Sequence, residues 1–148
     1  MPQNKPLLWT LVMILFLSNT ACGRSAARSS SGKAGQEGVS SPGTVLVTNS
    51  LDLDFSKHKV TFIELGADRC IPCKAMQPIM KEIAAEFAGK IQVVFYDVWK
   101  DPEPARKYKI QLIPTQVFMD QKGNEIFRHV GFFSKEEILK MLLEKGIL

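Results

Sequence analysis

The sequence predicts an α/β fold class, in which a central mixed β-sheet is flanked by helices on both faces. Three observations favour it: apolar runs typical of buried strands, a segment with helical apolar spacing between two of them, and a hairpin signal in the second half. The composition is globular, since 45% of the 148 residues are hydrophobic and 23% are charged. We expect one folded domain at residues 44–148, which is long enough to bury a core of its own.

The first half of this domain is predicted to contain two strands and one long helix. Residues 45–47 are a short apolar run that suits an edge strand. Residues 60–65 (VTFIEL) have the β-branched and aromatic composition of a buried central strand. Between residues 71 and 87, apolar side chains recur at spacings of three and four, which predicts an amphipathic helix. Gly89 is the signal for the end of that helix.

The second half begins with another buried strand, at residues 91–96 (IQVVFY). A short helix is expected at residues 102–108, where proline is tolerated in the first turn. Two further strands are predicted, at residues 116–119 and 125–130. The polar, glycine-containing segment 120–124 between them indicates a hairpin.

The chain is predicted to finish with a helix at residues 134–144. Ser134 with Glu137 three residues later forms the pattern of a capping box, which satisfies free N–H groups at a helix start. The helix is expected to bury a stripe of three apolar side chains: Ile138, Leu139 and Leu142.

Residues 1–21 predict a secretory signal peptide. Lys5 supplies a short positive region, and LLWTLVMILFL at residues 7–17 is an apolar run shorter than a membrane-spanning helix. On this interpretation the protein is exported to the cell envelope or periplasm. The alternative is that the segment is retained as an N-terminal anchor helix.

The segment LSNTAC at residues 17–22 resembles the lipobox of bacterial lipoproteins, in which small residues precede a lipidated cysteine. Cys22 is therefore the candidate for lipidation, although Asn19 stands where leucine is usual. Several acyl chains on one terminus are enough for stable attachment to a membrane. The alternative is a cysteine that only ends the signal peptide.

Residues 22–43 are rich in Ser, Gly and Ala and lack apolar periodicity, so we expect a flexible tether. The formal net charge of the whole chain is +4, but residues 44–148 carry 15 basic and 14 acidic side chains. The folded part is therefore nearly neutral, and its charges are interspersed. This pattern argues against a nucleic-acid partner.

The chemistry is expected at the C-x-x-C motif Cys70-Ile71-Pro72-Cys73, where a strand and loop lead into the first helix. A helix N-terminus offers free N–H groups and partial positive charge, which lower the pKa of a thiol. We expect Cys70 to be the exposed nucleophile and Cys73, one turn into the helix, to be more buried. Pro72 has the fixed φ that suits a first turn.

The motif has two alternative interpretations. A structural zinc site needs a full tetrahedral ligand set, whereas residues 44–148 offer two cysteines and only His58 and His129 as histidines. We therefore expect no metal. An inert structural disulfide is the second alternative, but closing so short a loop stabilises a fold little.

From about residue 60 to the end, the sequence resembles the thioredoxin family. The C-x-P-C motif follows a central strand, and Pro78 matches the proline that kinks the first helix of that family. The segment Ile113-Pro114-Thr115 matches the cis-proline loop that faces the active-site disulfide, and Gly131 matches a glycine near the same groove. The resemblance implies a thioredoxin fold, a cis peptide bond before Pro114, and a substrate strand that pairs with the free backbone of Ile113. It also implies that the Cys70–Cys73 pair is the redox group, with no further cofactor.

Glu64 stands six residues before Cys70, where the family often has a buried acid beneath the disulfide. Burial raises the pKa of a carboxyl group, so Glu64 is expected to accept a proton from Cys73 near neutral pH, through water. The alternative is a partly exposed glutamate at a strand end, with no role in the chemistry.

Three positions depart from the family pattern. Arg69 replaces the usual tryptophan before the first cysteine, and we expect it either to lower the pKa of Cys70 or to pair with Asp68 in solvent. Ile71 replaces a glycine and adds an apolar rim to the active-site loop. Phe95 replaces a lysine that often lies near the buried acid.

The function implied by the resemblance is that of a thiol–disulfide oxidoreductase. Together with the predicted export signal, it suggests an enzyme of the cell envelope that reduces the disulfides of envelope proteins. Its electrons would come from an integral-membrane thiol carrier, of the kind that serves cytochrome c maturation. We expect a monomer held to the membrane through a lipid anchor. One alternative is a disulfide-forming oxidant, although the sequence lacks the inserted helical domain of such oxidases. The other is a redox-inert or chaperone-like binding module that uses the groove at Pro114, although the intact Cys70 and Cys73 argue against it.

Overall fold

The computed structural model describes residues 41–148. The predicted signal peptide, Cys22 and residues 22–40 of the predicted tether lie outside the described residues. Residues 41–43, which we assigned to the tether, form a turn in which the Thr44 N–H and hydroxyl both donate to the Ser41 carbonyl, at 3.2 and 2.7 Å. In the described part of the chain, no helix is both long enough and apolar enough to cross a membrane.

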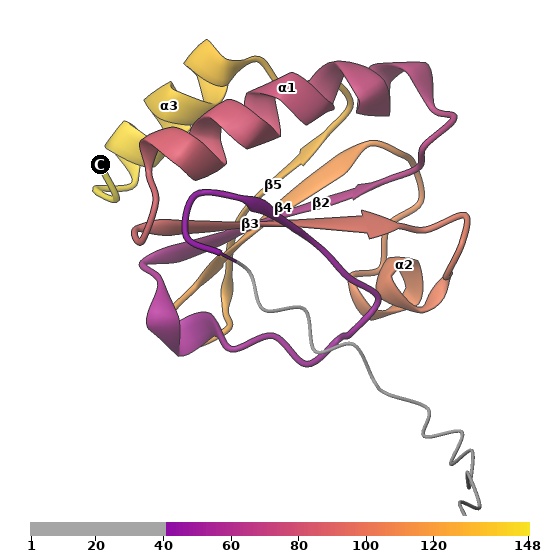
Figure 1. Ribbon diagram of the computed structural model, residues 1–148, viewed down its shortest axis with the longest axis horizontal. Helices are drawn as coiled ribbons and strands as arrows, with labels where there is room; N and C mark the ends of the chain where they lie inside the picture. Colours follow the sequence, from indigo (N-terminus) through magenta and orange to yellow (C-terminus); the bar gives the residue numbers. More distant parts are fainter. Residues whose placement is uncertain (1–40) are drawn as a thin grey trace, which may run out of the picture. The chain divides into compact units, whose positions relative to one another are not determined.

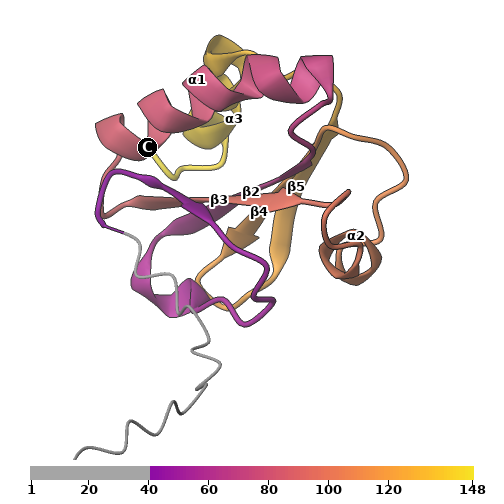
Figure 2. The same ribbon diagram turned by 45° about the vertical axis from the view of Figure 1, so that its right-hand side comes forward.

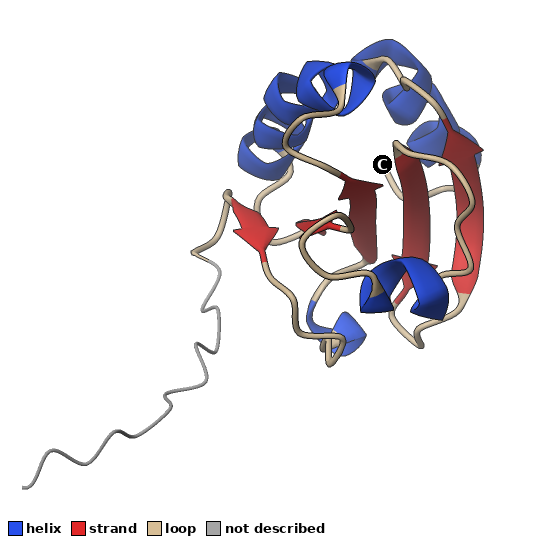
Figure 3. Ribbon diagram, turned by 90° about the vertical axis from the view of Figure 1, so that its right-hand side faces the viewer, coloured by secondary structure: helices blue, strands red, loops and turns tan. Residues whose placement is uncertain are grey.

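A five-stranded mixed sheet forms the centre of the domain (Figure 3). In spatial order its strands are β1 (Val45–Val47), β3 (Ile91–Asp97), β2 (Val60–Gly66), β4 (Thr115–Asp120) and β5 (Glu125–Val130). The first three run parallel, while β4 is antiparallel to both β2 and β5. Every residue of the central strand β2 is buried, as its apolar, β-branched composition predicts.

Helices cover both faces of this sheet, which confirms the predicted fold class (Figures 1 and 2). Two of them, α1 (Ile71–Glu86) and α3 (Lys135–Glu144), lie together on one face. The short α2 (Glu103–Lys107) lies on the other face, in the connection between β3 and β4. A single 3-10 turn, η1 (Phe55–Lys57), precedes β2. Helix α1 begins a few residues after β2 ends, so its N-terminus lies at the carboxyl end of this central strand.

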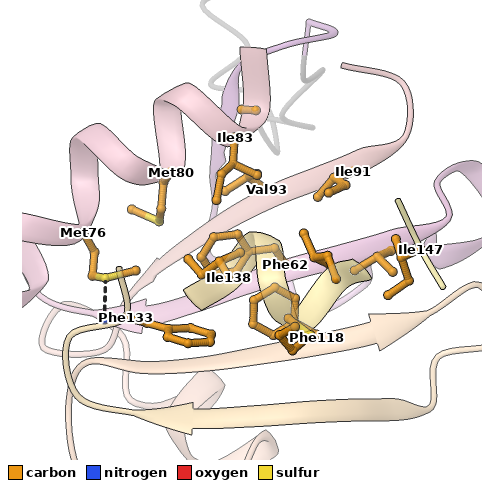
Figure 4. Packing of buried hydrophobic residues seen from close by; sticks show 14 of the residues in the cluster. Phe62, Met76, Met80, Ile83, Ile91, Val93, Phe118, Phe133, Ile138 and Ile147 are labelled. Atoms are coloured by element: carbon orange, nitrogen blue, oxygen red, sulfur yellow. Dashed lines mark hydrogen bonds between the residues drawn. The ribbon is translucent and has the colours of Figure 1, made fainter. Parts of the chain in front are cut away.

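The larger core cluster fills the space between the sheet and helices α1 and α3 (Figure 4). Phe62 stacks on Phe118 with ring centroids 4.7 Å apart, and Phe133 meets the Phe118 ring edge-on. Burial of each such side chain contributes about 1.5–3 kcal/mol. The Phe133 N–H donates to the Met76 sulfur at 3.3 Å, which ties the segment before α3 to α1. A smaller cluster on the α2 face contains Ile63, Leu65, Val94, Tyr96, Tyr108, Val117 and Met119.

Two details at the helices differ from the prediction. Helix α1 is capped by Phe87, and Gly89 adopts its positive φ of 78° in the turn that follows. The predicted capping box at the start of α3 is present, but the third buried side chain of α3 is Met141 and Leu139 is only half-buried. The reason is helical geometry, since Met141 lies one turn beyond Ile138 on the same face and Leu139 lies to the side of it.

Candidate active site

Cys70 and Cys73 form a disulfide at the N-terminus of α1, with their Cα atoms 5.2 Å apart. Cys70 is the N-cap residue of the helix, and Pro72 lies in the first turn as predicted. The Cys73 N–H donates to the Cys70 sulfur at 3.3 Å. When the disulfide is reduced, that N–H group and the positive end of the helix favour a thiolate at Cys70.

The two sulfurs differ in accessibility. Cys73 is 1% exposed, and Cys70 is 9% exposed. Cys70 is thus the more accessible of the two, but it is mostly covered rather than exposed as the sequence suggested, because it packs with Ala67 and the side chain of Ile113. A substrate sulfur therefore has only a small part of the Cys70 surface to approach.

Gly66, the last residue of β2, lies directly beneath Cys73. A Cβ at this position would be 3.2 Å from both the Cβ and the sulfur of Cys73, and 3.1 Å from the Phe95 ring. The absence of a side chain therefore allows the start of α1 to pack closely on the sheet. The sequence does not reveal this requirement, since a glycine at a strand end has no distinctive local pattern.

We expect Gly66→Ala to destabilise the protein by about 1–3 kcal/mol, because the added methyl overpacks this contact. Chemical denaturation of the single variant measures the loss. Gly66→Ala combined with Cys73→Ala is the control, and the alanine at position 66 should cost less there, since one of the close contacts is with the sulfur. An equal cost in both backgrounds would contradict this account.

The cis-proline loop lies beside the disulfide, between α2 and β4. The Ile113–Pro114 peptide bond is cis, as the family resemblance implies. The Pro114 carbonyl accepts from the Gly131 N–H at 2.8 Å, and the Thr115 hydroxyl donates to the Leu112 carbonyl at 2.7 Å. Within residues 41–148, the N–H and carbonyl of Ile113 make no backbone hydrogen bond. This leaves a short edge with which an extended peptide can pair.

Glu64 lies on β2 and is completely buried. Burial raises the pKa of its carboxyl group to about 8, partly opposed by a hydrogen bond from Gln116. Alternation along the strand places Glu64 on the same face as Gly66, which is the face that touches Cys73. Its Oε1 has no hydrogen-bond partner among the described residues, so this oxygen is available to carry a proton.

Gln116 is a second site residue that the sequence does not single out. It lies opposite Glu64 in the antiparallel β2–β4 pair, and it is fully buried. Its Nε2 donates to Glu64 Oε2 at 2.9 Å and to the Gly131 carbonyl at 3.1 Å. The amide therefore joins the buried acid to the segment that holds the cis-proline loop. Phe95, on the other side of Glu64, is buried and supplies only apolar contact.

Arg69 does not pair with Asp68, so one of the two interpretations offered for it is wrong. The Asp68 carboxylate binds Lys100, which also lies 3.3 Å from a carboxylate oxygen of Asp97. These three side chains meet because β2 and β3 end side by side, a pairing that sequence spacing does not display. Ile71 is 81% exposed and forms an apolar rim beside the disulfide, as predicted.

Comparisons with known proteins agree with this geometry. The sequence model of the Thioredoxin family matches residues 44–144. A thioredoxin from Staphylococcus aureus is 36% identical over 95 residues, which is 62% of this chain and 89% of that protein.

Two solved structures are similar to the domain as well. A mutant thioredoxin from Halobacterium salinarum NRC-1 superposes with a TM-score of 0.63 at 26% identity, covering 75% of this chain and 97% of that one. A thioredoxin from Nicotiana alata gives a TM-score of 0.60 at 30% identity, covering 71% and 95%. With the fold and the Cys70–Cys73 disulfide in place, the chain belongs to the thioredoxin family and is a thiol–disulfide oxidoreductase.

Proposed function

We propose that this protein is an exported reductase of disulfide bonds in proteins of the cell envelope. The observation that carries the proposal is the arrangement of Cys70 beside the unpaired backbone of Ile113. A polypeptide that pairs with Ile113 brings a disulfide of its own to the sulfur of Cys70. Thr115 and Gly131 support this groove by holding the loop around Pro114.

The reaction proceeds in two exchanges. The Cys70 thiolate attacks one sulfur of the substrate disulfide, the substrate bond breaks, and the released thiolate takes up a proton. Cys73 then gives its proton to Glu64 through water, and its sulfur attacks Cys70 in the mixed disulfide. The Cys70–Cys73 bond forms, the second substrate thiol leaves, and two electrons have passed from the protein to the substrate. The cysteine pair is the redox group, and no other cofactor enters this scheme.

An exported reductase needs a thiol donor to reduce Cys70–Cys73 after each turnover. The proposed donor is an integral-membrane thiol carrier, which delivers electrons from the cytoplasmic side. Attachment of the protein to the membrane through Cys22 would keep the two together, and the tether would let the domain reach its substrates. The proposed working form is a monomer.

Insulin reduction with dithiothreitol as electron source tests the proposal. We expect the protein to accelerate precipitation of the reduced insulin chains well above the rate with dithiothreitol alone. A measured reduction potential for the Cys70–Cys73 pair then separates a reductase from an oxidant, because a reductase needs a potential below that of its substrates. No acceleration would contradict the reductase and favour a redox-inert binding module.

The proposed lipid anchor has a separate test. Replacing the cysteine in Cys22→Ser removes the only thiol in the lipobox-like segment, so the variant should accumulate as unprocessed precursor or as a soluble form. Fractionation and mass spectrometry of the full chain in a bacterial host measure both results, and Ser18→Ala in the same segment is the control. A Cys22→Ser variant that stays with the membrane at the wild-type mass would overturn lipidation.

A further inference from the structure

The carboxyl end of β2, next to Cys70, has a different neighbour on each side, and the cis-proline loop is only one of them. Strand β2 pairs with β3 on one side and with β4 on the other, so its carboxyl end lies between Asp97 and Thr115. The loop around Pro114 occupies the β4 side. On the β3 side there is a cavity of about 330 Å³, lined by Asp68, Arg69, Asp97, Trp99 and Lys100.

The two acidic side chains of this cavity already have partners. Asp97 is buried, and its carboxylate accepts from the N–H groups of Asp68, Trp99 and Lys100 at 3.1–3.3 Å. The Lys100 ammonium binds both Asp97 and Asp68. One lysine and three backbone donors therefore stabilise the two carboxylates. The two carboxylates and Lys100 together keep one negative charge, which the charge of Arg69 balances across the cavity.

Arg69 is the cation of the cavity that has no partner. Its side chain is exposed, and among the described residues it makes no ion pair or hydrogen bond. Trp99 forms another wall of the cavity, and its side chain is 63% exposed. Arg69 and Trp99 line the same cavity. A guanidinium group can bind a carboxylate through paired hydrogen bonds, and an accessible indole offers an apolar surface for the methylene groups that carry that carboxylate.

We propose that this cavity is a specificity subsite for an acidic side chain close to the reacting cysteine of a substrate polypeptide. The inference rests on the proposed reduction of polypeptide disulfides. Arg69 precedes Cys70 directly, so a residue that flanks the substrate cysteine comes within its reach while the cysteine is bound to Cys70. The site is open to solvent, and an exposed charge pair of this kind is worth about a two- to fivefold preference in kcat/KM.

Matched peptide disulfides provide the test. Each is a symmetrical dimer of one short peptide with a single cysteine, and Glu, Gln or Lys stands beside that cysteine, on its N-terminal side in one set and on its C-terminal side in the other. The full-length protein reduces them with dithiothreitol as electron source. Each kcat/KM is divided by the uncatalysed rate with dithiothreitol, because a charged neighbour also changes the intrinsic reactivity of the disulfide.

We expect at least one set to follow the order Glu above Gln above Lys. The preference should shrink when salt is raised from about 0.05 to about 0.5 M, since the screening length falls several-fold. Arg69→Gln should bring the Glu-to-Lys ratio close to one. Asp68→Asn should increase the ratio, because it removes one of the two partners of Lys100.

Lys74→Gln is the matched control for net charge, since Lys74 is exposed, follows Cys73 directly and lies outside the cavity. It should retain most of the preference for the Glu peptide. Equal kcat/KM for the three peptides, or a ratio that Arg69→Gln leaves unchanged, would overturn the subsite while leaving the reductase intact. Failure to reduce any peptide would overturn the proposed function and the subsite together.

Discussion

Cys73→Ser should turn the protein into a trap that remains covalently attached to its substrates, whereas Cys70→Ser should capture none. The reason is the position of each sulfur. Cys70 is the more accessible and accepts the Cys73 N–H at the helix start, whereas Cys73 is 1% exposed. Without Cys73 the mixed disulfide forms at Cys70 but cannot be resolved, and turnover in either variant should fall to the background rate.

Non-reducing gels of cell-envelope extracts measure the trapped complexes, and mass spectrometry locates the linked cysteine. Alkylation of the reduced wild type at mildly acidic pH should label Cys70 first, because the helix N-terminus lowers the pKa of its thiol. A variant with both Cys22→Ser and Cys73→Ser is the control, and it should trap as efficiently as Cys73→Ser in extracts. Faster labelling of Cys73 would reverse the assignment of roles.

The elements of the fold were predictable because their signals are local. The apolar runs that became β2 and β3, and the spacing of apolar residues in α1, reflect which side chains must leave water. The capping box at Ser134 and Glu137 lies within one helical turn and was equally readable. The cis peptide before Pro114 came from family resemblance, since the local sequence alone favours trans.

The remaining features depend on which strands become neighbours. Gln116 joins Glu64 because β4 pairs antiparallel with β2 in one particular register, which no local pattern gives. Lys100 reaches Asp68 because β3 ends beside β2, and this pairing leaves Arg69 without a partner. The small exposure of Cys70 has the same origin, because Ile113, from the loop before β4, packs against the cluster that contains Cys70.

Glu64→Gln should change how stability depends on pH. In the folded protein, burial raises the pKa of Glu64 to about 8, against an ordinary value of 4.5 that we take for the unfolded chain. The folded state therefore binds the proton of Glu64 more tightly than the unfolded state does. The free energy of unfolding of the wild type should fall by up to about 1.4 kcal/mol per pH unit as pH rises from about 4.5 to about 8. The glutamine keeps the shape and the hydrogen bond from Gln116 without this loss. Denaturation at several pH values measures the difference, which should be largest above pH 8.

Glu64→Gln should also slow the step in which Cys73 resolves the mixed disulfide, because the glutamine cannot accept the proton of Cys73. Only the ionised carboxylate can take the proton of Cys73, so the rate of the resolving step in the wild type should rise as Glu64 ionises near pH 8. Loss of a general base typically costs about 10²–10⁴-fold, and less where water can replace it. Stopped-flow kinetics of mixed-disulfide resolution should show that Glu64→Gln lacks this rise, while Glu136→Gln, an exposed carboxyl group on α3, retains it. An identical rate and pH profile in Glu64→Gln would assign the proton of Cys73 to water and leave Glu64 as an acid buried only at a cost to stability.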